Sequence, residues 1–207
     1  MLILIDIDGT LVPYVNNHQH FYQCACGRRF EGSSLVNAQP ISCPSCGENS
    51  FKRDEPSIEE CRLFITSLLN KPISPFPGSA ILVSELSLKH SIIYMTTREY
   101  AFYEGTKTWL LTNGFPFKTQ TQLIMRKDNN RDHPYHIKEK ILKTLCKDKN
   151  EIIIIDDDLS LAFLAIKCGL RFIRAPICWE EGTYDGDLLR KICGLPTDLE
   201  RNKKNGF

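Results

Sequence analysis

The sequence of 207 residues lacks three features that would each point to a particular class of protein. It contains no apolar run near the roughly 18–20 residues that a membrane-spanning helix needs, so we expect no membrane partner. It has no excess of one charge, because 26 Lys+Arg stand against 25 Asp+Glu, and this argues against holding nucleic acid by bulk charge. It shows no secretory signal, because Met1 leads into a short apolar run that acids follow at once. We therefore expect a soluble, cytoplasmic protein.

A disulfide framework is also disfavoured, because the nine cysteines are odd in number and accompany no secretion signal. Five of them are scattered in apolar or helical contexts and are expected to be small buried hydrophobes: Cys61, Cys146, Cys168, Cys178 and Cys193. The other four form two pairs with sixteen residues between them: Cys24, Cys26, Cys43 and Cys46. Two pairs on tight, Gly-containing turns predict a tetrahedral four-thiolate Zn²⁺ site.

The segment around these cysteines, residues 15–52, resembles a zinc ribbon, although its first pair is C-x-C rather than C-x-x-C. His18 and His20 are spare ligands. So short a segment cannot build a core, and the metal replaces one, so the module is either a structural cap over the site described next or a nucleic-acid contact. Residues suited to stacking on bases and contacting phosphates are Phe21, Tyr22, Arg28, Arg29, Phe30, Phe51, Lys52 and Arg53.

The most informative stretch is residues 2–11, L-I-L-I-D-I-D-G-T-L. The apolar run from Leu2 to Ile5 is short and does not alternate, which predicts a strand buried on both faces of a parallel sheet. Asp6 and Asp8 follow it and, two residues apart, would project to the same side. Adjacent carboxylates repel unless a cation lies between them or one is protonated. A cation site is therefore expected where this strand ends.

Strand and helix patterns alternate over the rest of the chain, which predicts a doubly wound, parallel, Rossmann-like α/β sheet with right-handed crossovers. Further strands are expected at 92–95, 121–125, 152–155 and 171–173. Helices are expected at 56–70, 79–89, 99–112, 135–146, 159–168 and 185–193, with Gly114 and Gly169 ending two of them. The sheet domain would comprise residues 1–14 and 53–207, with 15–52 inserted after the first strand.

Polar residues follow two of these strands. Thr96, Thr97 and Arg98 come directly after the run I-I-Y-M, and Asp156, Asp157 and Asp158 follow four isoleucines in E-I-I-I-I-D-D-D. Open α/β sheets bind ligands at the carboxyl ends of their strands, so hydroxyls, a guanidinium and further acids are expected beside the first acid pair.

D-I-D-G-T-L, a strand ending T-T-R, Lys138 and I-I-I-I-D-D-D together resemble the haloacid dehalogenase-like (HAD) superfamily of phosphohydrolases. The stretches P-F-P-G, Y-M-T-T-R-E, T-x-x-W-L, I-M-R, R-D and H-I-K-E-K-I-L are similar to the phosphatase half of polynucleotide kinase–phosphatases. The kinase half has no counterpart, because G-x-x-x-x-G-K-[ST] is absent, and the cysteine-rich segment is foreign to that family.

The resemblance implies a nucleophile, an acid–base group and a metal site. Asp6 would attack phosphorus to form an aspartyl-phosphate, and Asp8 would protonate the leaving oxygen and then activate water. Mg²⁺ would be held by Asp6, the backbone carbonyl of Asp8 and Asp157. A glycine twelve residues after Asp157 matches the family spacing, which makes Asp156 and Asp157 the acid pair and leaves Asp158 outside it.

The resemblance also implies how the phosphoryl group is bound. Thr96 and the backbone N–H of Thr97 would bind its oxygens, and Lys138 would pair with Asp6 and the phosphoryl group. Arg98 and Arg126 would grip substrate phosphate. Only spacing favours Lys138 over the nearby Lys140 as the motif lysine. Equal losses of activity on mutating either lysine would leave this choice unsupported.

The implied activity is Mg²⁺-dependent hydrolysis of phosphomonoesters, on nucleotides or on the 3′- or 5′-phosphate ends of nucleic acid. One alternative is a phosphatase of small sugar or metabolite phosphates. Another is a HAD fold that has lost catalysis and binds nucleic acid, although all four motifs keep their acids and lysine. The sequence does not indicate an oligomeric state.

Overall fold

The computed structural model describes residues 1–13, 20–26, 29–32, 45–46, 51–54, 58–70, 73–146, 151–180 and 183–196. The chain divides into two compact units, Met1–Pro13 with Ile65–Phe207 and Tyr14–Phe64. The smaller unit contains the predicted insertion, residues 15–52, and ends inside helix α1 (Ile58–Asn70). No helix in the described part of the chain is both long and apolar enough to cross a membrane.

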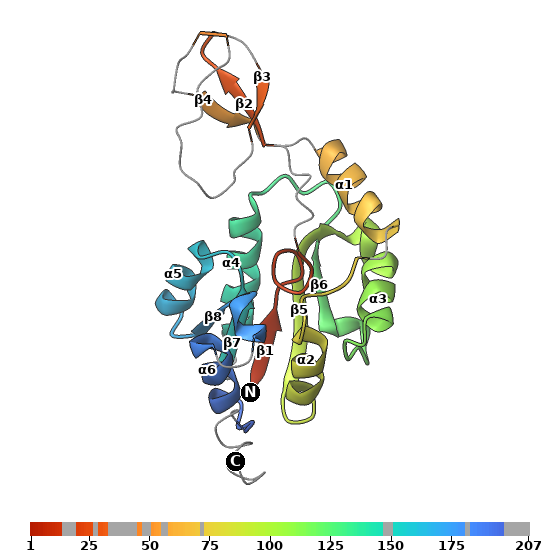
Figure 1. Ribbon diagram of the computed structural model, residues 1–207, viewed down its shortest axis with the longest axis vertical. Helices are drawn as coiled ribbons and strands as arrows, with labels where there is room; N and C mark the ends of the chain where they lie inside the picture. Colours follow the sequence, from red (N-terminus) through yellow and green to blue (C-terminus); the bar gives the residue numbers. More distant parts are fainter. Residues whose placement is uncertain are drawn as a thin grey trace. The chain divides into compact units, whose positions relative to one another are not determined.

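The larger unit is built on a five-stranded parallel sheet (Figure 1). Its strands are β1 (Leu2–Ile5), β5 (Ser91–Glu99), β6 (Leu123–Arg126), β7 (Ile152–Asp156) and β8 (Arg171–Arg174). They lie in the order β6-β5-β1-β7-β8, so β1 is the central strand. The predicted parallel α/β sheet is therefore confirmed. The apolar runs explain the centre of the sheet, because every residue of β7 is buried.

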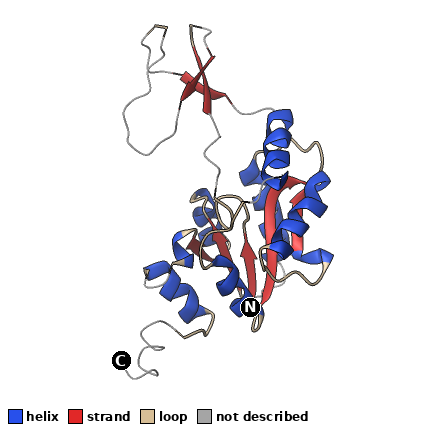
Figure 2. Cartoon of the chain, turned by 45° about the vertical axis from the view of Figure 1, so that its right-hand side comes forward, coloured by secondary structure: helices blue, strands red, loops and turns tan. Residues whose placement is uncertain are grey.

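Helices cover both faces of this sheet (Figure 2). Alternate residues of β7 point to opposite faces: Ile153 and Ile155 join one apolar cluster, whereas Ile152 and Ile154 join the other. The first face packs against α2 (Ser79–Ser87), α3 (Tyr103–Thr112) and α6 (Tyr184–Ile192). The second packs against α4 (Pro134–Leu145) and α5 (Ser160–Lys167). Burial on both faces is what the unbroken apolar strands require.

Several element boundaries differ from the sequence prediction by one to four residues, and in two places the structure shows why. The helix expected at 99–112 begins at Tyr103, because β5 continues to Glu99, which pairs with Arg126 of β6, and a 3₁₀ turn follows. The strand expected at 121–125 begins at Leu123, because Thr119 and Gln122 form a reciprocal capping box around a 3₁₀ turn. The glycines predicted to end helices do adopt left-handed backbone, with φ of 80° at Gly114 and 67° at Gly169.

The smaller unit contains a three-stranded antiparallel sheet. Its strands are β2 (His20–Cys24), β3 (Arg29–Gly32) and β4 (Phe51–Asp54), in the order β3-β2-β4. Cys24 ends β2, and Cys26 and Cys46 lie in turns. The described cysteines of this unit therefore lie at a strand end and in turns, where side chains can converge without interrupting the sheet.

Candidate active site

The acids of the opening motif lie just beyond the central strand, where the strand order changes direction. Asp6 is 4% exposed and follows β1, and Asp156 is fully buried at the end of the neighbouring β7. Thr96 and Arg98 come from the carboxyl end of β5, on the other side of β1. The parallel register therefore gathers residues from three strands at one edge of the sheet.

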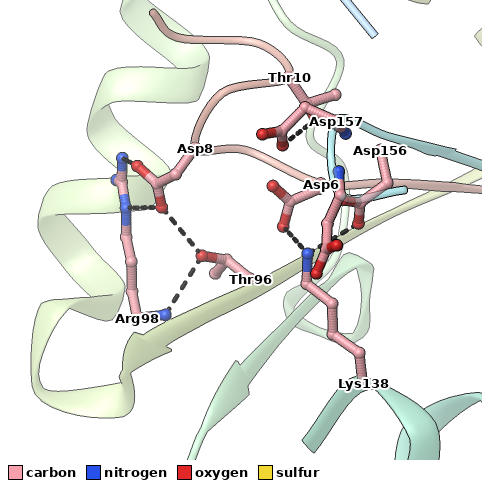
Figure 3. Close-up of polar contacts among 9 residues, drawn as sticks. Asp6, Asp8, Thr10, Thr96, Arg98, Lys138, Asp156 and Asp157 are labelled. Carbon is pink, nitrogen blue, oxygen red and sulfur yellow. Dashed lines mark hydrogen bonds and ion pairs between the residues drawn. The ribbon is translucent and has the colours of Figure 1, made fainter. Parts of the chain in front are cut away.

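Lys138 bridges the two buried acids (Figure 3). It lies on α4, with its Nζ 2.9 Å from Asp6 Oδ1 and 2.7 Å from Asp156 Oδ2. Lys140 is exposed and pairs with Asp132 at 2.6 Å. In the sequence, only spacing favoured Lys138 over Lys140. In the structure, Lys138 is buried against the acids and Lys140 is not.

Three carboxylates, those of Asp6, Asp156 and Asp157, have oxygens within 4.8 Å of one another. Burial raises the pKa of Asp6 well above its usual range, and the Asp156 charge adds to this while Lys138 opposes it. Burial likewise raises the pKa of Asp156, and burial together with the Asp156 charge raises the pKa of Asp157 to about 6. Burial alone would lower the pKa of Lys138, but the two neighbouring carboxylates raise it instead. The cluster therefore holds more negative charge than its surroundings stabilise.

A divalent cation fits this donor set. When all are ionised, three carboxylates and one ammonium leave two uncompensated negative charges. All three donors are hard oxygen ligands, which Mg²⁺ prefers. Asp6, Asp156 and Asp157 are therefore the residues that would hold the ion.

Asp8 faces away from this cluster, toward Arg98 (Figure 3). Arg98 Nη2 donates to Asp8 Oδ1 at 2.6 Å and Nε donates to Oδ2 at 2.9 Å, a bidentate pair. The Thr96 hydroxyl also donates to Asp8 Oδ2, at 3.3 Å. Arg98 is only 4% exposed, and its Nη1 donates to Thr106 on α3 at 3.2 Å. Arg98, predicted to bind substrate phosphate, is thus engaged with protein groups on each of its nitrogens.

The other predicted phosphate-binding residues lie along the same sheet edge. Thr97 lies between Thr96 and Arg98 in β5 and is partly exposed. Arg126 ends β6, where its Nε is buried and has no hydrogen-bond partner among the described residues. Asp158, which the family spacing leaves outside the acid pair, accepts the backbone N–H of Ser160 at 2.9 Å, at the start of α5.

Three residues that sequence reasoning did not single out support the site. Thr106 contacts Arg98, as described above. The Thr10 hydroxyl donates to Asp157 Oδ1 at 3.2 Å and accepts the Asp157 backbone N–H at 3.1 Å. Trp179 Nε1 donates to the Thr10 carbonyl at 2.7 Å. Thr10 stands in the D-x-D-G-T stretch and could have been noted, whereas nothing in the sequence links Trp179 to a residue 169 positions away.

The smaller unit brings cysteine sulfurs together. The Sγ atoms of Cys24, Cys26 and Cys46 all lie within 4.8 Å of one another. Those of Cys24 and Cys46 are 3.5 Å apart. Cys43, the fourth predicted ligand, and His18 lie outside the described residues. The side chains of His20 and of the predicted nucleic-acid contacts also lie outside the description: Phe21, Tyr22, Arg28, Arg29, Phe30, Phe51, Lys52 and Arg53.

Comparison with known proteins adds no assignment. No protein-family model matches the chain, and no curated protein matches it significantly. The observations that bear on function are therefore the motifs and the geometry of the buried acids, Lys138 and the Asp8–Arg98 pair.

Proposed function

We propose that this chain is a Mg²⁺-dependent phosphomonoester hydrolase of the HAD type that works through an aspartyl-phosphate. One observation carries the proposal: Asp6 lies at the carboxyl end of the central strand with Lys138 at 2.9 Å and two further carboxylates close by. A nucleophilic carboxylate needs positive charge beside it to stabilise the phosphoryl group. Lys138 supplies one such charge, and the two further carboxylates would bind the divalent cation that supplies the rest. The order of motifs along the chain supports the same reading.

In the proposed reaction, a carboxylate oxygen of Asp6 forms a bond to phosphorus while the bond from phosphorus to the ester oxygen breaks. Asp8, in its carboxylic acid form and with the protonated oxygen turned from Arg98, gives its proton to that leaving oxygen. Asp8 then takes a proton from water, whose oxygen attacks phosphorus and releases inorganic phosphate and free Asp6. Lys138 remains beside Asp6 throughout and stabilises the charge that builds on the phosphoryl oxygens.

Mg²⁺, held by Asp6, Asp156 and Asp157, would supply further positive charge to the phosphoryl group. The backbone carbonyl of Asp8 stays a predicted fourth ligand. The protein's own residues orient the acid–base group: Arg98 and Thr96 fix both oxygens of the Asp8 carboxylate. We therefore favour a role for Arg98 in holding Asp8, and leave the grip on substrate phosphate to the Thr97 N–H and Arg126.

Replacement of the nucleophile tests the reaction. Asp6→Asn should abolish Mg²⁺-dependent release of phosphate, with a loss of about 10⁴-fold or more, because the amide cannot form the intermediate. Asp158→Asn is the matched control, because it changes a neighbouring acid whose Oδ1 accepts the Ser160 N–H, and an amide oxygen can accept the same hydrogen bond. Asp6→Asn with activity near wild type would show that the nucleophile is assigned wrongly.

The proposed substrates are nucleotides and phosphorylated ends of nucleic acid. A panel with Mg²⁺ should compare mononucleotides, oligonucleotides with 3′- or 5′-phosphate, and sugar phosphates. Highest kcat/KM on a nucleotide or an oligonucleotide end would support the proposal. Equal or better hydrolysis of sugar phosphates would favour the metabolite phosphatase, and binding of oligonucleotides without hydrolysis would favour a catalytically silent binding protein.

For the smaller unit we propose a structural Zn²⁺ site formed by Cys24, Cys26, Cys46 and, from the sequence, Cys43. Zinc–sulfur bonds of about 2.3 Å in a tetrahedron put neighbouring sulfurs roughly 3.8 Å apart. The 3.5 Å between Cys24 and Cys46 is close to that spacing and far longer than a disulfide bond. Whether this unit also contacts nucleic acid, or covers the active site, stays a prediction.

A further inference from the structure

We propose that Trp179 is a positioning residue for the cation site, acting through Thr10 on Asp157; the inference rests on the metal site of the proposed function. Trp179 lies in a 3₁₀ turn at Ile177–Trp179, after the last strand of the sheet, and is 2% exposed. Its indole N–H donates to the backbone carbonyl of Thr10 at 2.7 Å.

The sheet order explains why this hydrogen bond matters. Thr10 lies in the loop after β1, and Trp179 lies in the loop after β8. Because β7 lies between those strands, the hydrogen bond links the loops on either side of the strand end that carries Asp157. The loops that flank the metal ligand are thereby fixed to each other.

Thr10 transmits this constraint to the metal ligand. Its side chain is fully buried, and its hydroxyl both donates to Asp157 Oδ1 and accepts the Asp157 backbone N–H. Asp157 is the least enclosed of the three carboxylates, being only partly buried, so it has the greatest freedom to turn away. Rotation of Thr10 would move its hydroxyl away from Asp157. The hydrogen bond from the Trp179 indole N–H to the Thr10 carbonyl opposes that rotation.

The backbone hydrogen bonds that close this loop use a different carbonyl from that of Thr10. The turn after β1 is closed by the N–H groups of Leu11 and Val12, both of which donate to the carbonyl of Ile7. Among the described residues, the donor to the Thr10 carbonyl is the indole N–H of Trp179, across 169 positions of sequence. A residue that hydrogen-bonds a metal ligand directly, as Thr10 does, commonly changes metal affinity by about 10- to 100-fold when removed. Trp179 acts one contact further out, so we expect an effect at the low end of that range.

Trp109 provides a matched control for the loss of an indole. Its Nε1 also donates to a backbone carbonyl, that of Ile73, at 3.0 Å, and its ring packs against the same apolar core. Trp109→Phe and Trp179→Phe therefore remove the same N–H from the same kind of hydrogen bond. Only the second of these bonds leads to Asp157. A purely structural role predicts similar effects of the two substitutions on cation binding.

The experiment measures binding of Mg²⁺ alone to the full chain, from the rise in melting temperature with Mg²⁺ concentration. Trp179→Phe should raise the apparent dissociation constant for Mg²⁺ by about 10-fold, and Trp109→Phe by less than about 2-fold. At saturating Mg²⁺, kcat on any phosphomonoester that the protein cleaves should be similar in both variants. Thr10→Val should weaken Mg²⁺ binding, and Thr10→Ser should restore it because the hydroxyl returns.

Fluorescence gives a second readout that does not depend on Trp179→Phe folding. The chain has two tryptophans, so Trp109→Phe leaves Trp179 as its single tryptophan. Its emission should change on Mg²⁺ binding, and Asp157→Asn should remove that change.

The inference would be overturned if Trp179→Phe and Trp109→Phe had equal apparent dissociation constants for Mg²⁺. It would also be overturned if Mg²⁺ raised the melting temperature of Trp109→Phe without changing its Trp179 emission. If the wild-type chain binds no Mg²⁺ at all, the metal site and this inference fail together. If it binds Mg²⁺ and responds at Trp179 but hydrolyses no phosphomonoester, the proposed activity fails and the positioning role stands.

Discussion

The ammonium group of Lys138 lies 2.9 Å from Asp6, and the two side chains are both nearly excluded from solvent. Lys138→Met should therefore remove charge stabilisation at the nucleophile and lower kcat by about 10²–10³-fold, the loss typical of one such group. Steady-state hydrolysis of any accepted phosphomonoester measures this. Folding is checked by circular dichroism, because the substitution also leaves buried acids without their counter-charge.

Lys140→Met is the matched control, two residues along the same helix. Its ammonium is exposed and pairs with Asp132, so activity should stay within about 2-fold of wild type. Similar losses in the two variants would mean that the burial of Lys138 has no catalytic meaning.

The Asp8–Arg98 pair predicts a separation of kcat from KM. Arg98→Lys keeps the charge but loses the two-nitrogen fork, so Asp8 should be held less firmly and kcat should fall by about 10-fold or more. Because the guanidinium is buried among protein groups, KM should change little. A large rise in KM with unchanged kcat would restore the original prediction that Arg98 binds substrate.

Arg126→Gln should show the opposite pattern. The residue ends β6, and its Nε is one of the buried side-chain nitrogens that lack a partner in the described part of the chain. If Arg126 grips substrate phosphate, its removal should raise KM by about 10-fold with a smaller effect on kcat, since the loss is one of charge-assisted hydrogen bonds. An unchanged KM would exclude that role.

The fold could be predicted in outline because its strongest signals are local. Four isoleucines followed by Asp156 indicate a buried inner strand without reference to anything else in the chain, and the same holds for Leu2–Ile5. The position of Lys138 beside Asp6 agrees with the motif spacing.

The partners within the site could not be predicted, because they are long-range and depend on side-chain direction. Asp8 and Arg98 are 90 positions apart, and both had separate roles by analogy; only the structure shows that they engage each other. The prediction of where β5 ends was wrong for a related reason. Glu99 is a good helix former, but its backbone pairs with β6 and its carboxylate accepts the N–H of Asn129 at 2.7 Å.

The raised pKa values of the acid cluster predict that Mg²⁺ and protons compete. Asp157, with its pKa raised to about 6 by burial, binds its proton more tightly when folded than when unfolded. The stability this gives is complete below the unfolded pKa of about 4 and is lost as pH rises through about 6. Mg²⁺ needs the ionised form, so the rise in melting temperature that it causes should be larger at about pH 7.5 than at about pH 5.

Thermal unfolding at both pH values, with and without Mg²⁺, measures this difference. Asp157→Asn has no such proton to lose, so its Mg²⁺ effect should be smaller and less dependent on pH. A Mg²⁺ effect that is equal at both pH values in the wild-type chain would contradict a site built on these carboxylates.

The clustered cysteines predict that the purified protein carries about one Zn²⁺ per chain, measurable by elemental analysis. Cys24→Ser and Cys46→Ser should each lose most of this zinc, because a hydroxyl is a far weaker ligand than a thiolate, and Cys43→Ser should do the same if it completes the tetrahedron. Cys146→Ser is the control, since that partly buried thiol lies in the larger unit, at the end of α4. Zinc lost from the three cluster variants and kept in the control would establish the site; freshly purified wild-type protein without zinc would remove it.

Because a unit this small depends on its metal for a core, zinc loss should also make residues 14–64 the first part of the chain that a protease cleaves, while the parallel sheet and its acids persist.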